Sequence, residues 1–102
     1  MARRVVVHRG FSADLTEAID WYEALDTPSG QRFAKSVERA LSSLKRGNHG
    51  TPKPGARRGE RWLAVPGFKV WVVFVERPGL VFIAGLRHSS RRPKSRDSRL
   101  PR

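Results

Sequence analysis

The sequence has no cysteine among its 102 residues, which excludes disulfide bonds, thiol catalysis and cysteine-ligated zinc sites. It also lacks any apolar run near the roughly 20 residues that a helix needs to cross a bilayer. The "VVV" run near Met1 is shorter than the apolar core of about 7–15 residues in a secretory signal peptide. We therefore expect one soluble domain that works in the cytoplasm.

Acidic residues are scarce: 9 Asp and Glu stand against 21 Lys and Arg, and the net charge is +12. Five of the nine acids lie between Gly10 and Gln31, a segment without any Lys or Arg. The positive charge is left to the rest of the chain and is densest in "LRHSSRRPKSRDSRLPR", Leu86 to Arg102. Such an excess favours binding to a polyanion or to an acidic partner.

Two stretches of the first half repeat apolar residues at three- and four-residue steps, as one face of a helix does. The first stripe is Leu15, Ala18, Ile19, Tyr22 and Leu25, and the second is Phe33, Val37, Ala40, Leu41 and Leu44. We expect Ser12 to cap the first helix, and Thr27 before Pro28 to cap the second. Gly47 should end it. A β-branched run over residues 3–9 predicts a strand before this αα-hairpin.

The second half changes to strand-like runs rich in Val, Phe and Trp. Residues 47–60 are a loop by composition, and "RWLAV", "FKVWVVFVER" and "LVFIAGLRH" follow. Pro66-Gly67 and Pro78-Gly79 separate these runs, which predicts a three-stranded antiparallel meander. The fold class is then α+β: an N-terminal strand and a two-helix hairpin packed on an antiparallel sheet with a C-terminal meander. We expect one domain over residues 1–93 and a basic tail, without a fixed structure, over 94–102.

An ordered series of motifs resembles the RelE/ParE superfamily of type II toxins. The series is "FSADLTEAIDWYEAL", "GQRFAKSVERALSSL", "GTPKPGARR" and "GLRHSSRRP", and it covers about residues 4–93. The "DWY", the Gly-x-Arg-Phe and the His-x-x-Arg-Arg-Pro are closest to the ParE branch. The resemblance implies two helices against an antiparallel sheet. It also implies a small growth-inhibiting protein that is neutralised by a ParD-like or similar antitoxin.

The resemblance leaves two targets open. ParE-like members poison DNA gyrase, whereas RelE-like members cut mRNA on the ribosome. Metal-independent RNA cleavage needs a base for the 2′-hydroxyl, charge to stabilise the phosphorane and an acid for the leaving oxygen. In a ribonuclease Arg61, Arg87 and His88 would do this work. The only Tyr, Tyr22, belongs to a helical apolar stripe, so the C-terminal catalytic Tyr implied for ribonucleases is missing. This favours the ParE branch, with no catalysis of its own.

Residues adjacent in a strand point to opposite faces, so Arg87 and His88 share one site only if the strand ends there. The resemblance implies a target- or nucleic-acid-binding surface formed by Lys53, Arg57, Arg58, Arg61, Arg87, Arg91 and Arg92. Trp21 and Trp71 are candidates for antitoxin contact, although Trp71 and Trp62 are most simply packing residues. No spacing indicates a metal site, and no cofactor is expected. His8 and His49 are assigned no role.

Two further alternatives stay open. A basic nucleic-acid-binding domain without toxicity would explain the charge but not the ordered motifs. The second alternative is a toxin that has lost its activity and only binds its antitoxin.

Overall fold

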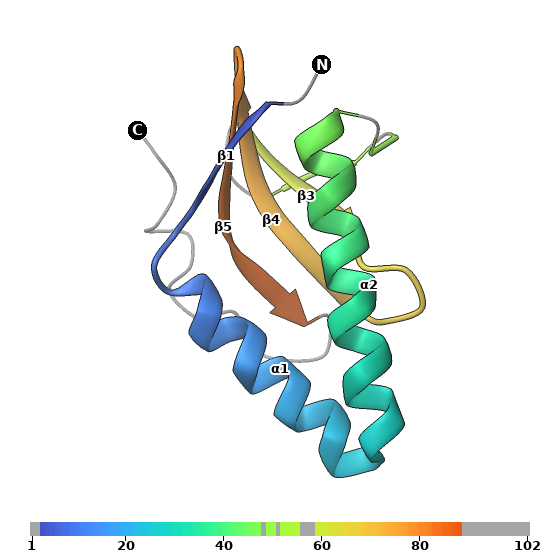
Figure 1. Ribbon diagram of the computed structural model, residues 1–102. Coiled ribbons are helices and arrows are strands. Elements are labelled where there is room, and N and C mark those ends of the chain that lie inside the picture. Colours follow the sequence, from blue (N-terminus) through green and yellow to red (C-terminus); the bar gives the residue numbers. More distant parts are fainter. Residues whose placement is uncertain (1–2, 48, 51, 56–58, 89–102) are drawn as a thin grey trace.

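The computed structural model describes residues 3–47, 49–50, 52–55 and 59–88. Its elements are β1 (Arg4–Val7), α1 (Phe11–Leu25), α2 (Thr27–Arg46), β2 (Lys53–Pro54), β3 (Glu60–Ala64), β4 (Val70–Arg77) and β5 (Leu80–His88). The five strands form one sheet in the order β1-β5-β4-β3-β2, and the helix hairpin lies on one face of it (Figure 1). The expected α+β class with a helix hairpin and a C-terminal meander is confirmed.

The sheet is mixed and not antiparallel throughout as expected, because β1 runs parallel to β5 while the other pairs are antiparallel. Val5 lies opposite Val81 and Val7 opposite Ile83 in that parallel pair. Parallel neighbours need a long crossover connection, and the helix hairpin with the meander supplies it. Neither helix has the length and apolar content that spanning a bilayer would require.

The helix caps differ from those expected. The cap position of α1 is Gly10, and the N–H of Gly10 donates to the Nδ1 of His8 at 2.9 Å. Because this contact already turns the chain at His8, Ser12 lies inside the helix. The cap of α2 is Asp26, whose Oδ1 accepts from the Ser29 N–H at 2.7 Å. The expected end at Gly47 is confirmed, with a left-handed φ of 76° that favours glycine.

The core lies between the helices and the inner face of the sheet. Its fully buried side chains include Phe33, Leu44, Val72, Phe74 and Ile83, which come from α2, β4 and β5. Burying each side chain of this size stabilises the fold by roughly 1.5–3 kcal/mol. The remaining surface of the sheet, which faces away from the helices, is called the outer face below.

The stretch expected to be a loop contains a short strand. In β2, Lys53 pairs with Trp62 and Pro54 with Arg61 of β3. The N–H of Gly55 then donates to the Glu60 carbonyl at 2.8 Å, which closes this edge of the sheet. The pairing brings Lys53 beside the meander. Arg57, Arg58, Arg91, Arg92 and the domain boundary predicted after residue 93 lie outside the described residues.

Candidate functional site

The end of β5 sends its last two side chains to opposite sides of the sheet. Leu86 belongs to the core, so Arg87 points to the outer face and His88 back toward the helices. The Arg87 guanidinium carbon lies 4.6 Å from the ring centroid of Trp62. The ring of His88 instead lies 5.0 Å from that of Trp21. A shift in the pairing of β4 with β5, between Val73 and Phe74, sets which residues of β5 face the core.

Two tryptophans and two cations form a cluster on the outer face, the tryptophan platform, which consists of Lys53, Trp62, Trp71 and Arg87. The two indole rings are 6.3 Å apart between centroids and tilted by 45°. The Nζ of Lys53 lies 4.2 Å from the Trp71 centroid and 4.8 Å from that of Trp62. Cations at such distances are attracted to the negative faces of the rings. The platform therefore holds two positive charges beside two half-buried aromatic surfaces.

Glu60 holds Trp62 of the platform in place through a hydrogen bond. Its carboxylate is buried with 1 % of the residue exposed, and Oε1 accepts a hydrogen bond from the indole N–H of Trp62. A buried carboxylate needs such donors, because burial without them is costly. The bond therefore orients the Trp62 ring toward Lys53 and Arg87.

Arg61 is not part of this platform. It pairs with Phe74, and cross-strand partners point to the same face, so Arg61 lies on the helix side of the sheet. Arg61 is also offset from Arg87 along β4. Arg61 pairs with Phe74 of that strand, whereas Arg87 pairs with Trp71, three residues earlier. The structure thus brings together Lys53, Trp71 and Arg87 of the predicted residues. It places Arg61 and His88 on the helix side of the sheet and Arg87 on the outer face.

The sequence reasoning missed Trp62 as a partner of these groups. The sequence feature that could have indicated this role is the alternation of side chains along the strand. Leu63 packs against the core, so its neighbour Trp62 points to the opposite face. That alternation places Trp62 on the outer face, but only the pairing with β2 places Lys53 over it.

Trp21 lies on the surface, as its position beside the apolar stripe indicates. It is 42 % exposed and packs edge-on against Tyr22, with 5.0 Å between the ring centroids. Burial raises the pKa of Tyr22 above its ordinary value of 10.0, and a hydrogen bond with the Lys69 backbone lowers it by less. The phenol is therefore neutral near pH 7.

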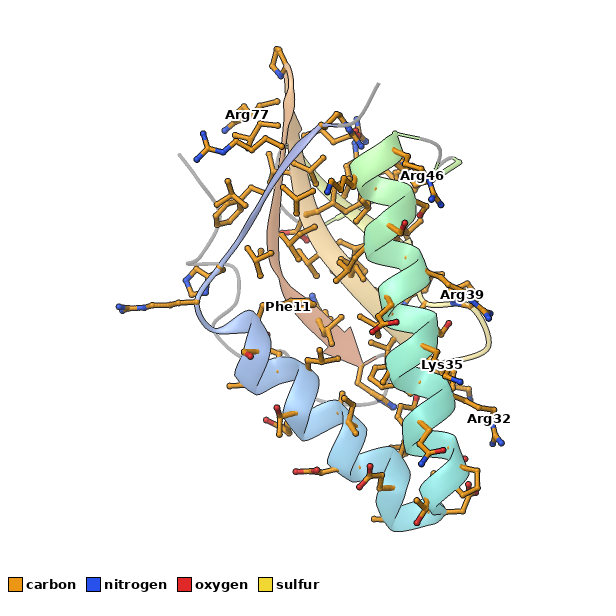
Figure 2. The ribbon with its side chains drawn as sticks, in the orientation of Figure 1. Phe11, Arg32, Lys35, Arg39, Arg46 and Arg77 are labelled. Carbon is orange, nitrogen blue, oxygen red and sulfur yellow. The ribbon has the colours of Figure 1, made fainter. Side chains whose placement is uncertain are left out.

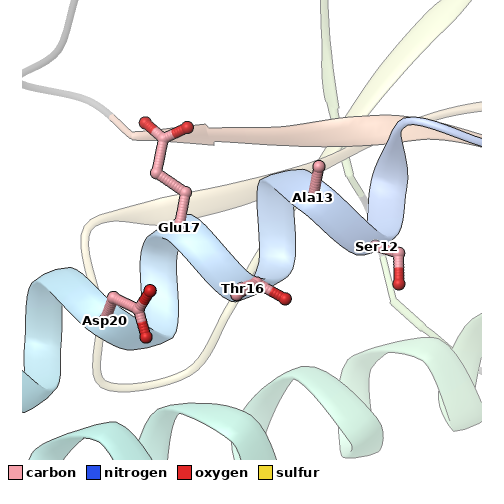
Figure 3. Close-up of a pocket in the computed structure, with 5 residues that line it drawn as sticks. All are labelled: Ser12, Ala13, Thr16, Glu17 and Asp20. Atoms are coloured by element: carbon pink, nitrogen blue, oxygen red, sulfur yellow. The ribbon is translucent and has the colours of Figure 1, made fainter.

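The acidic residues of α1 mostly face outward. A shallow hollow of about 470 Å³ is lined by Ser12, Ala13, Thr16, Glu17 and Asp20 (Figure 3). Asp20 is exposed and Glu17 is half-buried, and their carboxylates point to opposite sides of α1 (Figure 3). Asp14 differs, because it is only 6 % exposed and its Oδ2 accepts from the Leu86 N–H at 3.5 Å. Asp14 therefore joins α1 to β5.

A separate cluster joins the segment before β1, the residues after α2 and the end of β4. Glu76 forms an ion pair with Arg3, and the Nε2 of His49 lies 3.4 Å from its carboxylate. Burial alone would raise the pKa of Glu76, but hydrogen bonds from Arg3 and His49 and their charge lower it overall. A further bond of 2.5 Å runs from Arg3 to the Leu44 carbonyl. This cluster is structural, and His49 has a place in it. Over the described ranges, no group of three or more His, Asp or Glu side chains could hold a metal ion.

Comparison with known proteins gives matches among solved structures. The chromosomal ParDE TA system from P. aeruginosa aligns with a TM-score of 0.73 at 19 % identity, over 85 % of this chain and 96 % of that chain. The YoeB dimer from Staphylococcus aureus aligns with a TM-score of 0.54 at 11 % identity, over 86 % of this chain and 98 % of that one. The fold is that of the RelE/ParE toxins. No protein-family model and no curated protein matches the sequence.

The RelE/ParE-like fold confirms the fold that the resemblance of the ordered motifs implies. At these identities the likeness concerns the path of the chain, and the roles of single side chains have to be argued from their own surroundings.

Proposed function

We propose that this protein is the toxin of a type II toxin–antitoxin system, which inhibits bacterial growth by binding DNA gyrase in the cytoplasm. A cognate antitoxin, ParD-like or similar, would hold it inactive. The similarity to a ParDE structure, with a TM-score of 0.73 against 0.54 for YoeB, supports this proposal. The observation that carries it is the orientation of Arg87 and His88 to opposite faces.

Cleavage of RNA without a metal needs an acid and a base within reach of one phosphate. His88 packs against Trp21 and Tyr22 on the helix side, with ring centroids 5.0 and 6.3 Å away. Arg87 stands on the outer face with Trp62. Two groups on opposite faces of a strand are poorly placed to act on one phosphate, which speaks against the ribonuclease set of Arg61, Arg87 and His88. A surface that binds without breaking bonds needs no such set.

The tryptophan platform has the features of a binding surface. Aromatic rings and arginines are the residues most often found at the energetic centre of an interface. Lys53 and Arg87 would attract an acidic patch of the target, and Trp62 and Trp71 would supply the apolar area. The antitoxin would cover Trp71 on the platform and Trp21 on the helix side. It would thereby block access of the target to the platform.

The proposal is tested with the purified full-length chain in two parallel assays: DNA supercoiling by gyrase, and cleavage of mRNA on purified ribosomes. We expect lost supercoiling with accumulation of cleaved, gyrase-bound DNA, while the mRNA stays intact. The double variant Lys53→Gln/Arg87→Gln should lose most of this inhibition. The matched control is Arg9→Gln/Arg77→Gln, which removes the same charge from exposed positions outside the platform.

The other outcomes separate the alternatives. Cut mRNA with unaffected gyrase would reject the gyrase proposal in favour of a RelE-like ribonuclease, which the likeness to YoeB and the cationic platform favour as second candidate. Neither effect, with normal growth of cells expressing the chain, would leave a basic nucleic-acid-binding domain or an inactive toxin.

A further inference from the structure

The solvent side of α2 carries a row of positive charge. The helix has five Lys and Arg against one acid, Glu38. At about 3.6 residues per turn, four of the five cations fall within about 60° of one another around the helix axis. This row is called the α2 stripe and consists of Arg32, Lys35, Arg39 and Arg46. All four residues are exposed, and Figure 2 shows their side chains leaving α2 on one side. With a rise of about 1.5 Å per residue, the row is about 20 Å long.

The stability of the helix accounts for only part of this charge. Cations are favourable in the last turn of a helix, where they meet the negative end of its dipole, and Lys45 and Arg46 lie there. Arg32, Lys35 and Arg39 lie further from that end, where the dipole gives no such gain. No ion pair between described residues includes Lys35, Arg39 or Arg46. The charges of these three side chains are therefore available to a ligand.

The acids around α2 lie off the stripe. A Cβ at Gly30 would meet Glu23 of α1, so Gly30 marks the side of α2 that faces α1. That side is about half a turn from the stripe, so α1 and its acids are on the far side of α2 (Figure 2). Glu38 is about a quarter of a turn away and weakens the positive potential along one flank. Glu76 lies near the C-terminal end of α2 but is paired with Arg3.

Asp26 weakens the N-terminal end of the stripe. It caps α2, and hydrogen bonds with Ser29 and the charge of Arg32 lower the pKa of Asp26 below its ordinary value of 3.8. Its carboxylate is therefore ionised near pH 7 and offsets part of the charge of Arg32. The positive potential is consequently strongest along the other three cations of the stripe.

The surroundings of the stripe favour phosphates over other anions. The exposed large apolar residues among those described are Val7, Trp21 and Leu25, which belong to β1 and α1. The stripe thus offers no anchor to an apolar side chain, a lipid tail or an unpaired base. A row of cations without apolar neighbours matches the regular negative charge of a nucleic-acid backbone.

The dimensions of α2 favour duplex DNA over duplex RNA. An α-helix with its side chains is about 10–12 Å in diameter, and the major groove of B-form DNA is about 12 Å wide. A helix lying in that groove has phosphates within reach of its cations. The major groove of A-form RNA is too narrow to admit a helix in this way.

We infer that the α2 stripe binds the phosphate backbone of duplex DNA, with Lys35, Arg39 and Arg46 each at one phosphate and with little preference for base sequence. Contacts of this kind position a protein on DNA without reading its bases. The inference goes beyond the proposed binding of gyrase and does not rest on it. It uses the helix layer, whereas the tryptophan platform is on the outer face of the sheet (Figure 1).

The test follows the fluorescence anisotropy of a labelled short DNA duplex that is titrated with the full-length chain at several salt concentrations. Each phosphate contact contributes about −0.9 to the slope of log affinity against log salt concentration. The triple variant Lys35→Gln/Arg39→Gln/Arg46→Gln should therefore have a slope shallower by about 2–3 and an affinity at low salt lower by about tenfold or more. The comparison with the parent cancels the contribution of basic residues elsewhere in the chain.

The matched control is Arg4→Gln/Arg9→Gln/Arg77→Gln, which removes the same number of charges from exposed positions outside α2. It should keep most of the slope of the parent. Equal losses in the two triple variants would show attraction by net charge alone and overturn the inference.

Arg46 also stabilises the end of α2, so the double variant Lys35→Gln/Arg39→Gln is measured as well. Gln is about as good a helix former as Lys and Arg, and the circular dichroism of this variant should match that of the parent. Unchanged duplex binding by the folded double variant would contradict the proposed contacts. Tighter binding of a single strand or of an RNA duplex than of the DNA duplex would reject duplex DNA as the ligand.

These outcomes are separate from those of the gyrase assay, because the titration contains no gyrase. A chain that binds the duplex through the stripe but does not inhibit gyrase would reject the proposed function alone. A chain that inhibits gyrase but binds the duplex equally well without the stripe would reject this inference alone.

Discussion

Arg87 and His88 are consecutive in β5, yet their side chains serve two surfaces. The Arg87 guanidinium carbon lies 4.6 Å from the Trp62 centroid on the outer face, and the His88 ring lies 5.0 Å from Trp21 on the helix side. The strand continues through both residues, so its alternation holds to the end. One end of one strand thereby contributes to the tryptophan platform and to the surface around Trp21 on the helix side.

Substitution at these two positions should have separate effects on growth inhibition. Arg87→Gln removes a platform charge and should reduce inhibition by about tenfold, the size of an interface hot spot. His88→Ala should leave most of the inhibition intact, because the imidazole packs against Trp21 on the helix side, away from the platform. The measurement is the expression level at which growth stops, with Arg77→Gln as a charge-matched control on β4. Complete loss of inhibition in His88→Ala would instead indicate a catalytic histidine.

Trp62→Phe should destabilise the fold more than Trp71→Phe. The first change removes an N–H that donates to the buried carboxylate of Glu60, and the second removes no such bond in the described structure. Losing a donor to a buried charged group costs about 1–3 kcal/mol in the free energy of unfolding. Urea unfolding measures this difference. Equal losses in the two variants would show that Glu60 does not depend on the indole of Trp62.

Gly55→Ala should also destabilise, for a steric reason. A Cβ at Gly55 would overlap the buried side chain of Glu60, which would have to shift, so a cost of about 1–3 kcal/mol is expected. Gly30→Ala is the contrast, because its Cβ would meet only the flexible, exposed side chain of Glu23. Alanine is favoured over glycine within a helix by about 1 kcal/mol, so Gly30→Ala should be neutral or stabilising. Thermal unfolding of both variants checks the pair.

The Glu76 cluster predicts a stability that falls in acid. The folded pKa of Glu76 is lowered below its ordinary value of 4.5, so the unfolded chain binds the proton more tightly. Its contribution is therefore present above pH 4.5 and is lost as the pH falls through the lower folded value.

The test compares the parent with Glu76→Gln by urea unfolding at neutral and at acidic pH. The side chain of Glu76 is 35 % exposed, so solvent screens the ion pair and the difference at neutral pH should be about 1 kcal/mol or less. It should shrink as Glu76 of the parent is protonated. Glu38→Gln, which removes a carboxylate from an exposed site of α2, is the charge-matched control. A difference that grows in acid would contradict the predicted direction.

Much of the fold could be predicted because its signals are local. The stripes through Phe33 and Leu44 and the Pro-Gly turns at residues 66–67 and 78–79 depend on neighbours a few residues away. The caps were mispredicted for an equally local reason. Asp26 and Ser12 both suit a cap position, but only Asp26 takes it, at the start of α2. At the start of α1 the chain turns through the bond from the Gly10 N–H to His8, and Ser12 lies further on, within the helix.

The composition and order of residues by themselves determined the fold class, the basic character and the absence of thiol chemistry, because periodicity and charge are properties of the chain. Only the tertiary structure decided which candidates meet. Lys53 reaches Trp62 through the pairing of β2 with β3, and Arg61 is separated from Arg87 by facing the other side of the sheet. Strand pairing and register join residues distant in sequence, and they are set by the packing of the whole sheet against the helices.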